Sequence, residues 1–420
     1  MYQTIKKLFS TVSKVMCFTL IITSCSNDDD NNDNFPTSPS NVITISPGAN
    51  AQNEALDAFI EVESGQTILF EAGTFNFTGS LSMTGKNEII IKGSGRDQTY
   101  LDFSAQTSGG EGILVENSTS IRFENLTIKD AVGDALKTRE CTKVSFVNVA
   151  TVWSGEPSSN NGAYGLYPVL CDDVYIDNCY AYGASDSGIY VGQSNNVIVK
   201  NTVAEGNVGG IEIENTTNAD VFYNDVFDNT GGILVFDLPG LTQSGSGTRV
   251  FDNNIHDNNR SNFAPEGNII GNVPAGTGIM VLSTKNVEIF YNSLVDNNFT
   301  NILVASYLMV NPNPQDPTFN PFPQGLNIHE NSYTMSGTVN PNQPALAQAL
   351  MQLFQLTGYP NILLDGILMQ PTDVCLQEAT DPSFINLNAA ADPTFESFTM
   401  DTSPHDCSPD PLPQVEFDEF

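Results

Sequence analysis

The chain has 420 residues, of which 40% are hydrophobic, so it is long enough to bury an extended core. Its 15 basic and 49 acidic residues give a formal net charge of -34. This charge argues against nucleic acid as a partner, because such binding depends on Lys and Arg at phosphates, and also against contact with anionic lipid. We interpret the acidic excess as a solubility feature of a protein outside the cell.

The first 24 residues are typical of an export signal. Three lysines precede an apolar run at 15–22, which is much shorter than the roughly 20 residues of a transmembrane helix. The sequence Ile-Thr-Ser-Cys that ends at Cys25 resembles a bacterial lipobox, whose cysteine is lipidated and becomes the mature N-terminus. We therefore expect a lipoprotein signal peptide at 1–24 and a lipid anchor on Cys25. An ordinary signal peptide with an incidental cysteine is the alternative.

Residues 25–44 form an acidic tether rich in Asn, Asp, Ser and Pro, which cannot bury a core. The run Ser-Asn-Asp-Asp-Asp after Cys25 resembles the acidic tag that directs some Gram-negative lipoproteins to the exterior face of the outer membrane. A flexible acidic linker would have the same composition. We expect a lipid-anchored protein of the cell outer membrane that faces the exterior.

The segment 51–62 predicts a helix that closes the N-terminal end of the core. Leu56, Phe59 and Ile60 fall on one face of this helix. Strands are expected after it, near 67–70, 88–92 and 99–103.

An internal repeat is the main signal of the sequence. A small residue followed by alternating apolar positions recurs at Gly112, Ala135, Gly165, Gly188, Gly210, Gly232, Gly278 and Asn301. The steps are 23, 30, 23, 22, 22, 46 and 23 residues; the step of 30 is one coil with an inserted loop, and the step of 46 is two coils or one coil with a large insertion. Alternation indicates strands, and parallel strands one coil apart make a β-helix. We therefore predict an all-β fold, a right-handed parallel β-helix at 45–335.

A second series of strands follows the first out of phase and keeps its steps through the first five coils. Four successive members of this series end in asparagine, at Asn224, Asn253, Asn292 and Asn331. Asparagine side chains at an inward turn stack from coil to coil, each amide bonding the next. We expect these residues to be structural.

Residues 336–420 are expected to cap the C-terminal end with a helix and an irregular, cysteine-bearing tail. A helix is predicted at 344–357, with Pro344 at its first position and Gly358 just past its end. Its predicted apolar face consists of Leu346, Leu350, Leu353 and Phe354.

The cysteines suggest two disulfides in an oxidising compartment. Cys141 and Cys171 each follow a repeat leucine by five residues, so they occupy one column in adjacent coils, with Cα atoms roughly 5 Å apart. Cys375 and Cys407 would pair within the tail, which leaves Cys179 buried in the core.

Several stretches resemble an exported family of right-handed parallel β-helix repeat proteins that has no assigned function. They are Gly-Ile-Glu-Ile-Glu-Asn-Thr from Gly210, Asn-Thr-Gly-Gly-Ile-Leu-Val-Phe-Asp-Leu-Pro from Asn229, Asn-Phe-Ala-Pro-Glu-Gly from Asn262 and Val-Pro-Ala-Gly-Thr-Gly-Ile from Val273. The resemblance implies fold and export over roughly 45–335. It implies a second exported protein as partner, because the family's genes tend to lie beside one, and it supplies no catalytic residue. β-Helices at large include glycan lyases, epimerases and non-catalytic adhesins.

The outward positions of the repeat strand form a ladder that we take as the candidate site. Glu212 and Glu214 are the catalytic candidates, because paired carboxylates serve as acid and as base or nucleophile in glycoside hydrolysis. Candidate substrate-binding residues are Lys137, Arg139, Tyr167, Tyr190 and Phe236. A lyase would instead use Lys137, Arg139 and Tyr167. Insertions at 154–164, 238–248 and 261–276 would either wall this face as a groove or cover it.

No cofactor is expected, and no zinc-type Cys/His spacing exists in the sequence. Asp228, Asp257 and Asp296 recur at coil corners, where they suit a turn and would also suit Ca²⁺.

Two functions follow from the sequence. One is a surface protein that binds or processes extracellular glycan with a hydrolase- or lyase-like groove. The other is a non-catalytic module that acts with a second exported protein. Either would work as a monomer. An open or a covered outward face distinguishes them.

Overall fold

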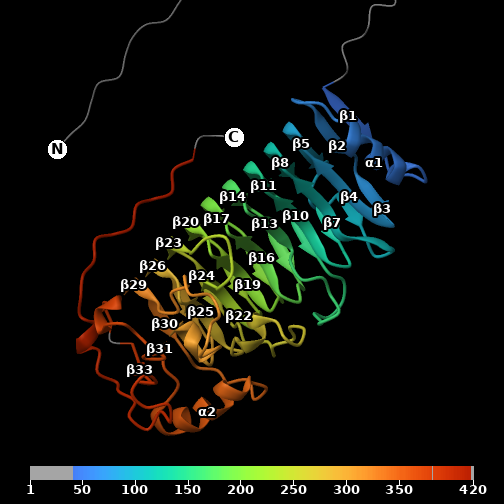
Figure 1. Cartoon of the computed structure of the whole chain (residues 1–420). Helices are drawn as coiled ribbons and strands as arrows, with labels where there is room; N and C mark the ends of the chain where they lie inside the picture. The colour runs from blue at the N-terminus through green and yellow to red at the C-terminus, as the bar shows by residue number, and fades with distance from the viewer. Residues whose placement is uncertain (1–40, 381, 418–420) are drawn as a thin grey trace, which may run out of the picture. The chain divides into compact units, whose positions relative to one another are not determined.

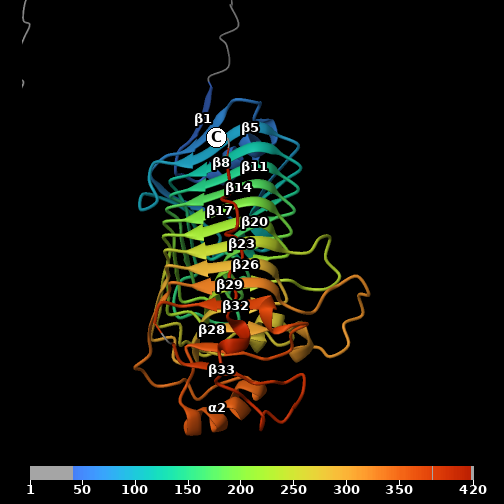
Figure 2. The same cartoon turned by 90° about the vertical axis from the view of Figure 1, so that its left-hand side faces the viewer.

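Each coil of the chain contributes one strand to each of three parallel sheets (Figures 1 and 2). The structure is a computed structural model and describes residues 41–417 except residue 381. Cys25, the signal at 1–24 and the tether up to residue 40 lie outside the described residues. The three sheets have 12, 10 and 11 strands, and we name them A, B and C. The parallel β-helix predicted from the repeat is confirmed.

The strands are short and regular. Sheet A consists of β1 (Val42–Ile45), β2 (Thr67–Phe70), β5 (Asn87–Gly93), β8 (Thr119–Glu124), β11 (Thr142–Val147), β14 (Asp172–Asp177), β17 (Asn195–Lys200), β20 (Thr217–Phe222), β23 (Ser246–Phe251), β26 (Lys285–Phe290), β29 (Gln324–His329) and β32 (Val374–Gln377). Sheet B consists of β3 (Gly73–Asn76), β6 (Thr99–Asp102), β9 (Thr127–Lys129), β12 (Ala150–Val152), β15 (Tyr180–Tyr182), β18 (Val203–Glu205), β21 (Asp225–Phe227), β24 (Asn254–His256), β27 (Ser293–Val295) and β30 (Ser332–Thr334). Sheet C consists of β4 (Gly79–Thr84), β7 (Ser108–Glu116), β10 (Asp134–Arg139), β13 (Leu166–Val169), β16 (Ser187–Gly192), β19 (Gly209–Glu214), β22 (Gly231–Phe236), β25 (Thr277–Leu282), β28 (Thr300–Ala305), β31 (Ile362–Leu364) and β33 (Phe384–Asn386).

Alternation along each strand separates the core from the outer faces. Ile211 and Ile213 of β19 belong to the continuous buried core, so Glu212 and Glu214 between and after them point to the outer face of sheet C. β22 pairs directly with β25, which shows that the 46-residue step is one coil with large insertions. The solenoid also continues past residue 335, because β31, β32 and β33 pair in register with sheets C and A.

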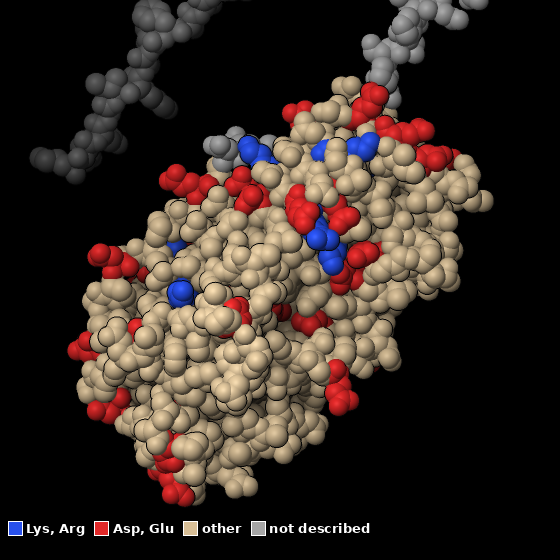
Figure 3. Space-filling view, in the orientation of Figure 1, with Lys and Arg blue, Asp and Glu red and all other residues tan. Residues whose placement is uncertain are grey.

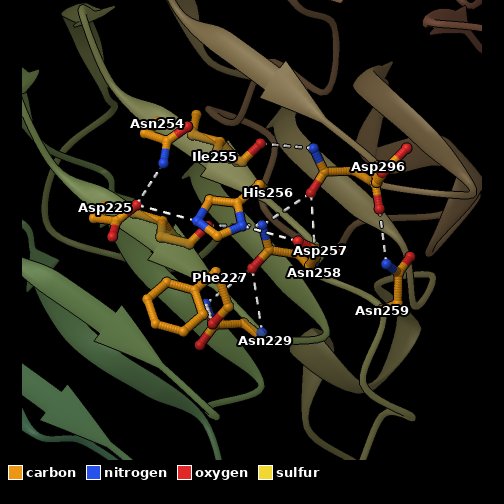
Figure 4. A network of polar contacts seen from close by, with 12 residues as sticks. Asp225, Phe227, Asn229, Asn254, Ile255, His256, Asp257, Asn258, Asn259 and Asp296 are labelled. Carbon is orange, nitrogen blue, oxygen red and sulfur yellow. Dashed lines mark hydrogen bonds and ion pairs between the residues drawn. The ribbon is translucent and has the colours of Figure 1, made fainter. Parts of the chain in front are cut away.

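Two ladders of asparagine amides close the coil corners. In the predicted ladder of Asn224, Asn253, Asn292 and Asn331, each Nδ2 donates to the next Oδ1 at 2.9–3.0 Å, which confirms the expected stacking. A second ladder, which the repeat pattern did not reveal, joins Asn207, Asn229, Asn258 and Asn297 in the same way. Figure 4 shows the Asn229–Asn258 step beside His256, whose imidazole contacts Asp225 and Asp257.

A helix lies near each end of the solenoid, as expected, and each buries the predicted apolar face in part. The N-terminal helix α1 (Ala51–Glu61) buries three alanines and Phe59, whereas Ile60 is 68% exposed, because adjacent helical residues point about 100° apart. The C-terminal helix α2 (Ala345–Thr357) buries Ala347, Leu350 and Phe354, while Leu346 is exposed. In the described part of the chain, no helix is long and apolar enough to cross a bilayer.

Helix α2 packs against the outer face of sheet C rather than over the end of the inner core. There it forms a second buried cluster with η1 (Ile269–Asn272) and with the outward side chains of β22, β25 and β28. The members of this outer apolar cluster include Leu234, Phe236, Met280, Leu282, Leu303, Ile270 and Phe354. The insertion at 261–276 therefore covers this part of the face.

The disulfide pattern matches one of the two expected bridges. Cys375 and Cys407 are bonded, with Cα atoms 5.1 Å apart. Cys141 and Cys171 are free and buried, so the predicted bridge between them is wrong. They do occupy neighbouring coils, but each thiol bonds to backbone carbonyls of its own and the preceding coil: Cys141 to Arg139 and Val115, Cys171 to Val169 and Thr138.

The reason lies in the column that these cysteines share. Thr216 occupies the same column, and its hydroxyl donates to the backbone oxygens of Glu214 and Val191. Cys141 and Cys171 therefore take the place of hydroxyl residues that bond along the stack. The C-terminal part of the chain also contains three short 3₁₀ turns: η2 (Tyr307–Met309), η3 (Pro371–Asp373) and η4 (Ser403–His405).

Candidate functional site

The outward ladder of sheet C places the sequence-predicted residues in two adjacent columns. Lys137 pairs with Tyr167, and Tyr190 with Glu212, so these four side chains follow one another in one column. Arg139 and Glu214 lie in the second column. In Figure 3, basic and acidic atoms gather over β10, and acidic atoms lie at the bottom of a hollow beside them, over β16 and β19.

Three tyrosines come together above this ladder. The ring centroids of Tyr164 and Tyr167 are 4.6 Å apart, those of Tyr164 and Tyr190 4.6 Å, and those of Tyr167 and Tyr190 4.8 Å. Lys137 Nζ lies 4.3 Å from the centre of the Tyr167 ring, a cation–π contact. The result is an aromatic surface with one cation at its edge.

Gly192 allows the Tyr190 ring to reach the second column. A Cβ atom at Gly192 would lie 2.4 Å from Cε1 and from the hydroxyl oxygen of Tyr190, so any larger residue would displace the ring. The hydroxyl of Tyr190 donates to Glu214 Oε1 at 2.5 Å. The glycine therefore fixes the contact between an aromatic side chain and a candidate catalytic carboxyl.

Three carboxyl groups are buried beneath these rings. Asp186, Glu212 and Glu214 expose 6%, 3% and 8% of their surface. Ser187 donates to Glu212 Oε2 at 2.5 Å, and the side-chain amide of Asn268 donates to Asp186 Oδ2 at 3.1 Å. We call Tyr164, Tyr167, Tyr190, Asp186, Glu212 and Glu214 the tyrosine–carboxylate cluster.

Burial makes the three carboxyls unusually weak acids. Desolvation, and then the charges of Asp186 and Glu214, hold the pKa of Glu212 well above its usual value. Desolvation raises the pKa of Glu214 to about 7 against the hydrogen bond from Tyr190, and that of Asp186 to about 6 against hydrogen bonds from Asn268, Ser187 and Tyr164. Within the described residues, no Lys, Arg or His forms an ion pair with any of the three. Burial therefore favours the protonated form of each of these carboxyls.

The predicted exposure of Glu212 and Glu214 is wrong. Both point out of the solenoid core as expected, but the tyrosine rings and the loop that carries Asn268 cover them. Phe236 is also misassigned as a substrate-binding residue, because it is 1% exposed within the outer apolar cluster.

The two predicted basic residues are paired with acids at the edge of the cluster. Lys137 Nζ lies 3.1 Å from Asp134 Oδ2, and Arg139 lies 3.6 Å from Glu116 and 3.0 Å from Glu140. Burial raises the pKa of Asp134, and the neighbouring Lys137 opposes that shift. Neither cation is in position to neutralise the three buried carboxyls.

Sequence reasoning missed several members of the site. Ser187 and Asp134 lie three residues before the ladder positions Tyr190 and Lys137, so the two-residue alternation of the strand does not identify them. Tyr164 and Asp186 stand in the turns that precede β13 and β16, where no periodic pattern applies. Asn268 comes from the insertion and carried no signal.

A polar cavity of about 570 Å³ lies beside the loop that carries Asn268. Its lining includes the side chains of Glu266, Asn272, Asn342 and Gln348 and no basic residue. Amide and carboxylate oxygens of this kind accept hydrogen bonds from hydroxyl groups. The cavity therefore extends the polar surface next to the cluster.

The corner aspartates behave as turn residues. Asp228, Asp257 and Asp296 have φ angles of 54°, 51° and 52°, a left-handed conformation that Asp tolerates at turns. Across the described ranges, no group of three or more His, Cys, Asp or Glu side chains is arranged to hold a metal ion.

Solved structures of other proteins are similar to this chain at low sequence identity. Similar solved structures include the A-module of the mannuronan C-5 epimerase AlgE6 of Azotobacter vinelandii, at 14% identity and TM-score 0.49, covering 78% of this chain and 87% of that one. A mutant DFA-IIIase of Arthrobacter chlorophenolicus A6 in complex with DFA-III has 12% identity and TM-score 0.47, with 77% and 92% covered. The Dettilon tailspike protein has 12% identity and TM-score 0.42, with 79% and 64% covered. Likeness at this level is common among β-helices of different activity, so it leaves the reaction open.

A search of curated proteins finds no significant match. The sequence profile described as "Right handed beta helix region" matches residues 87–240 and 158–333, which together exceed half of the chain. The chain therefore belongs to the family of proteins with a right-handed β-helix region.

Proposed function

We propose that this protein is a surface lipoprotein that binds extracellular glycan on the outer face of sheet C and cleaves it hydrolytically at the tyrosine–carboxylate cluster. The observation that carries the proposal is the burial of Asp186, Glu212 and Glu214 beside three contacting tyrosines, with no basic ion-pair partner among the described residues. Buried carboxyls lower stability at neutral pH, and strongly perturbed groups of this kind concentrate at functional sites. Aromatic rings beside hydrogen-bonding groups suit a sugar.

The different pKa values of Glu212 and Asp186 suit the two roles that hydrolysis needs, a general acid and a base. Glu212, whose pKa burial and neighbouring charges raise furthest, is the general acid that protonates the leaving oxygen. Asp186, with a pKa that burial raises only to about 6, is ionised at neutral pH and is the base. In the part of the chain that the structure describes, no Lys, Arg or His pairs with these carboxyls. This favours a neutral glycan over a uronate, because a uronate would add a negative charge to three acids.

A non-catalytic module is the second candidate, and the low exposure of Glu212 and Glu214 favours it. In that case the partly exposed Tyr164 and Tyr167, with Lys137 at their edge, bind glycan or a second exported protein. The cluster then stabilises the aromatic surface through its hydrogen bonds.

A panel of neutral and uronate-containing polysaccharides, assayed for both binding and degradation, separates the candidates. We expect Glu212→Gln to retain binding and to lose at least about 100-fold in turnover, since it removes the general acid. Glu140→Gln, an exposed change beside the same face, is the control and should leave turnover unchanged. Binding by the wild-type chain without any degradation would select the non-catalytic module. Unchanged turnover in Glu212→Gln would contradict the assigned acid.

The lipid anchor is tested separately. The proposal places the protein on the outer membrane through Cys25, which lies outside the described residues. Cys25→Ala should release the protein from the membrane fraction and abolish labelling with a fatty-acid probe. A wild-type chain that takes up no fatty acid would contradict the anchor.

A further inference from the structure

The C-terminal tail, residues 407–417, crosses the strands of sheet A on their outer face (Figure 2). The Cys375–Cys407 disulfide ties the start of the tail to β32. The other end reaches β14, where the ring centroid of Phe417 lies 6.1 Å from that of Tyr175. The tail therefore runs along the solenoid axis, back toward the N-terminal coils.

Two main-chain hydrogen bonds hold the tail between these ends. The backbone N–H of Leu412 donates to Glu288 Oε2 on β26 at 3.1 Å, and that of Val415 donates to Asp220 Oδ2 on β20 at 3.2 Å. Val415 is buried and Leu412 is half-buried, whereas the two residues between them are exposed. The tail thus places Leu412 and Val415, three residues apart, against the sheet.

The three-residue spacing of Leu412 and Val415 matches the distance across two coils. Three residues of an extended, polyproline-like chain span about 9.3 Å, and two coils span about 9.6 Å. Prolines at 409, 411 and 413 favour that extended conformation, and none of them replaces the N–H of Leu412 or Val415. An extended peptide can therefore place two residues, three apart, over β26 and β20.

The tail provides hydrogen-bond partners for only some of the polar atoms beneath it. Asp220, Arg249, Glu288 and Asn327 follow one another in a single outward column of sheet A. Asp220 Oδ1, Arg249 Nε and Asn327 Oδ1 are buried and have no hydrogen-bond partner among the described residues. Asp220 and Arg249 form an ion pair at 3.6 Å, which is too long for a hydrogen bond. Buried polar atoms without partners lower stability, so they point to a ligand that would complete them.

We propose that this column of sheet A is a binding surface for an extended peptide segment of another protein, and that the tail is its intramolecular occupant. The partner segment would carry two residues, three apart, that each have a main-chain N–H and an apolar side chain, as Leu412 and Val415 do. Between them, hydroxyl or amide side chains would donate to Asp220 and Asn327 and accept from Arg249. The surface lies on a different sheet from the tyrosine–carboxylate cluster, and the inference does not rest on the proposed function.

The test uses a chain that ends at Cys407, which keeps the disulfide and lacks the tail beyond it. The probe is a fluorescent peptide with the sequence of residues 408–420. We expect the shortened chain to bind this peptide at least 10-fold more tightly than the intact chain, whose tail already occupies the surface. A matched peptide with Leu412→Pro and Val415→Pro, which lacks both N–H donors, should bind at least 10-fold more weakly than the natural one.

Three outcomes would overturn the proposal. The first is a folded shortened chain, judged by circular dichroism, that does not distinguish the natural from the proline-substituted peptide. The second is binding of a polysaccharide, but not the peptide, to the exposed face. The third comes from hydrogen exchange in the intact chain and does not depend on the shortened chain folding. A displaceable tail exchanges the amides of Leu412 and Val415 at least 100-fold faster than that of Val221 in β20, whereas equal protection would make the tail a permanent part of the fold.

Discussion

Two stretches of the outer face of sheet C have the same backbone structure but carry different outward side chains. On β16 and β19 the outward positions hold Tyr190, Glu212 and Glu214, whereas the same columns on β22 hold Leu234 and Phe236. The polar stretch keeps weak acids buried beneath tyrosines, and the apolar stretch packs in one cluster with residues of α2 and η1. The inward isoleucines continue unchanged beneath both. The coil therefore constrains the inward positions and leaves the outward ones free to differ.

The two stretches should have opposite effects on stability. Burial of Phe236 and its neighbours removes apolar surface from water and stabilises the fold. Burial of Asp186, Glu212 and Glu214 removes ionisable groups from water and destabilises the fold wherever those groups would otherwise ionise. A chain that keeps the second arrangement next to the first retains it for a reason other than stability.

The largest expected effect comes from opening the apolar stretch. Phe236→Ala should lower the free energy of unfolding by about 3–5 kcal/mol, because it removes a ring from a closely packed cluster. Leu356→Ala in α2, at a side chain 86% exposed, should change it by less than about 0.5 kcal/mol. Urea denaturation followed by circular dichroism measures both. Equal midpoints for the two variants would show that the outer cluster contributes little to stability.

A smaller effect, of opposite sign, is expected in the polar stretch. Burial raises the pKa of Glu214 from 4.5 to about 7, so the folded chain binds this proton more tightly than the unfolded chain does. The contribution of Glu214 to stability should therefore be greatest below about pH 4 and should be lost as the pH rises through 7. Glu214→Gln cannot ionise and should be more stable than wild type at pH 8, by on the order of 2 kcal/mol. The difference in stability between the variant and the wild type should vanish below about pH 4. Thermal melts across this pH range measure it. A variant that melts at a lower temperature than the wild type at pH 8 would contradict the prediction.

The smallest effect is expected at the link between the two stretches. Asn268 lies just before η1 and donates to Asp186 of the cluster. Asn268→Ala should cost about 1 kcal/mol or less, and it should raise the pKa of Asp186 further, because a hydrogen bond to the carboxylate is lost. Asn272→Ala, whose amide bonds to Ile269 within the same loop, is the matched control. If hydrogen exchange of the loop and titration of Asp186 respond equally to both variants, the link has no specific role.

The sequence was sufficient to predict the coil and not what covers it. The repeat at Gly188, Gly210 and Gly232 identified strands that pair in register, and four spaced asparagines predicted a complete ladder. Both follow from local periodicity, which the backbone hydrogen bonds preserve. The burial of Glu212 depends instead on rings and a loop that arrive from other coils, and no pattern in its own strand reports them.

The same limit explains the cysteines and the tail. The spacing placed Cys141 and Cys171 in neighbouring coils but said nothing about where each thiol would find its hydrogen bond. Residues 407–417 have no periodic partner in the repeat, so their path over sheet A required the three-dimensional arrangement. The hydrogen bonds of these thiols and the path of the tail depend on tertiary contacts, which no local pattern in the sequence reports.

The asparagine ladder has a defined direction, and each of its ends is closed. At one end, Asn224 Oδ1 accepts the backbone N–H of Thr202. At the other end, the Glu378 carboxylate accepts the backbone N–H and the side-chain amide of Asn331, at 2.9 and 3.0 Å. An unclosed rung would offer an unpaired donor to the ladder of another molecule, and contacts that repeat head to tail build fibres. The Glu378 carboxylate supplies the acceptor that a further asparagine would provide, so the ladder ends within the molecule.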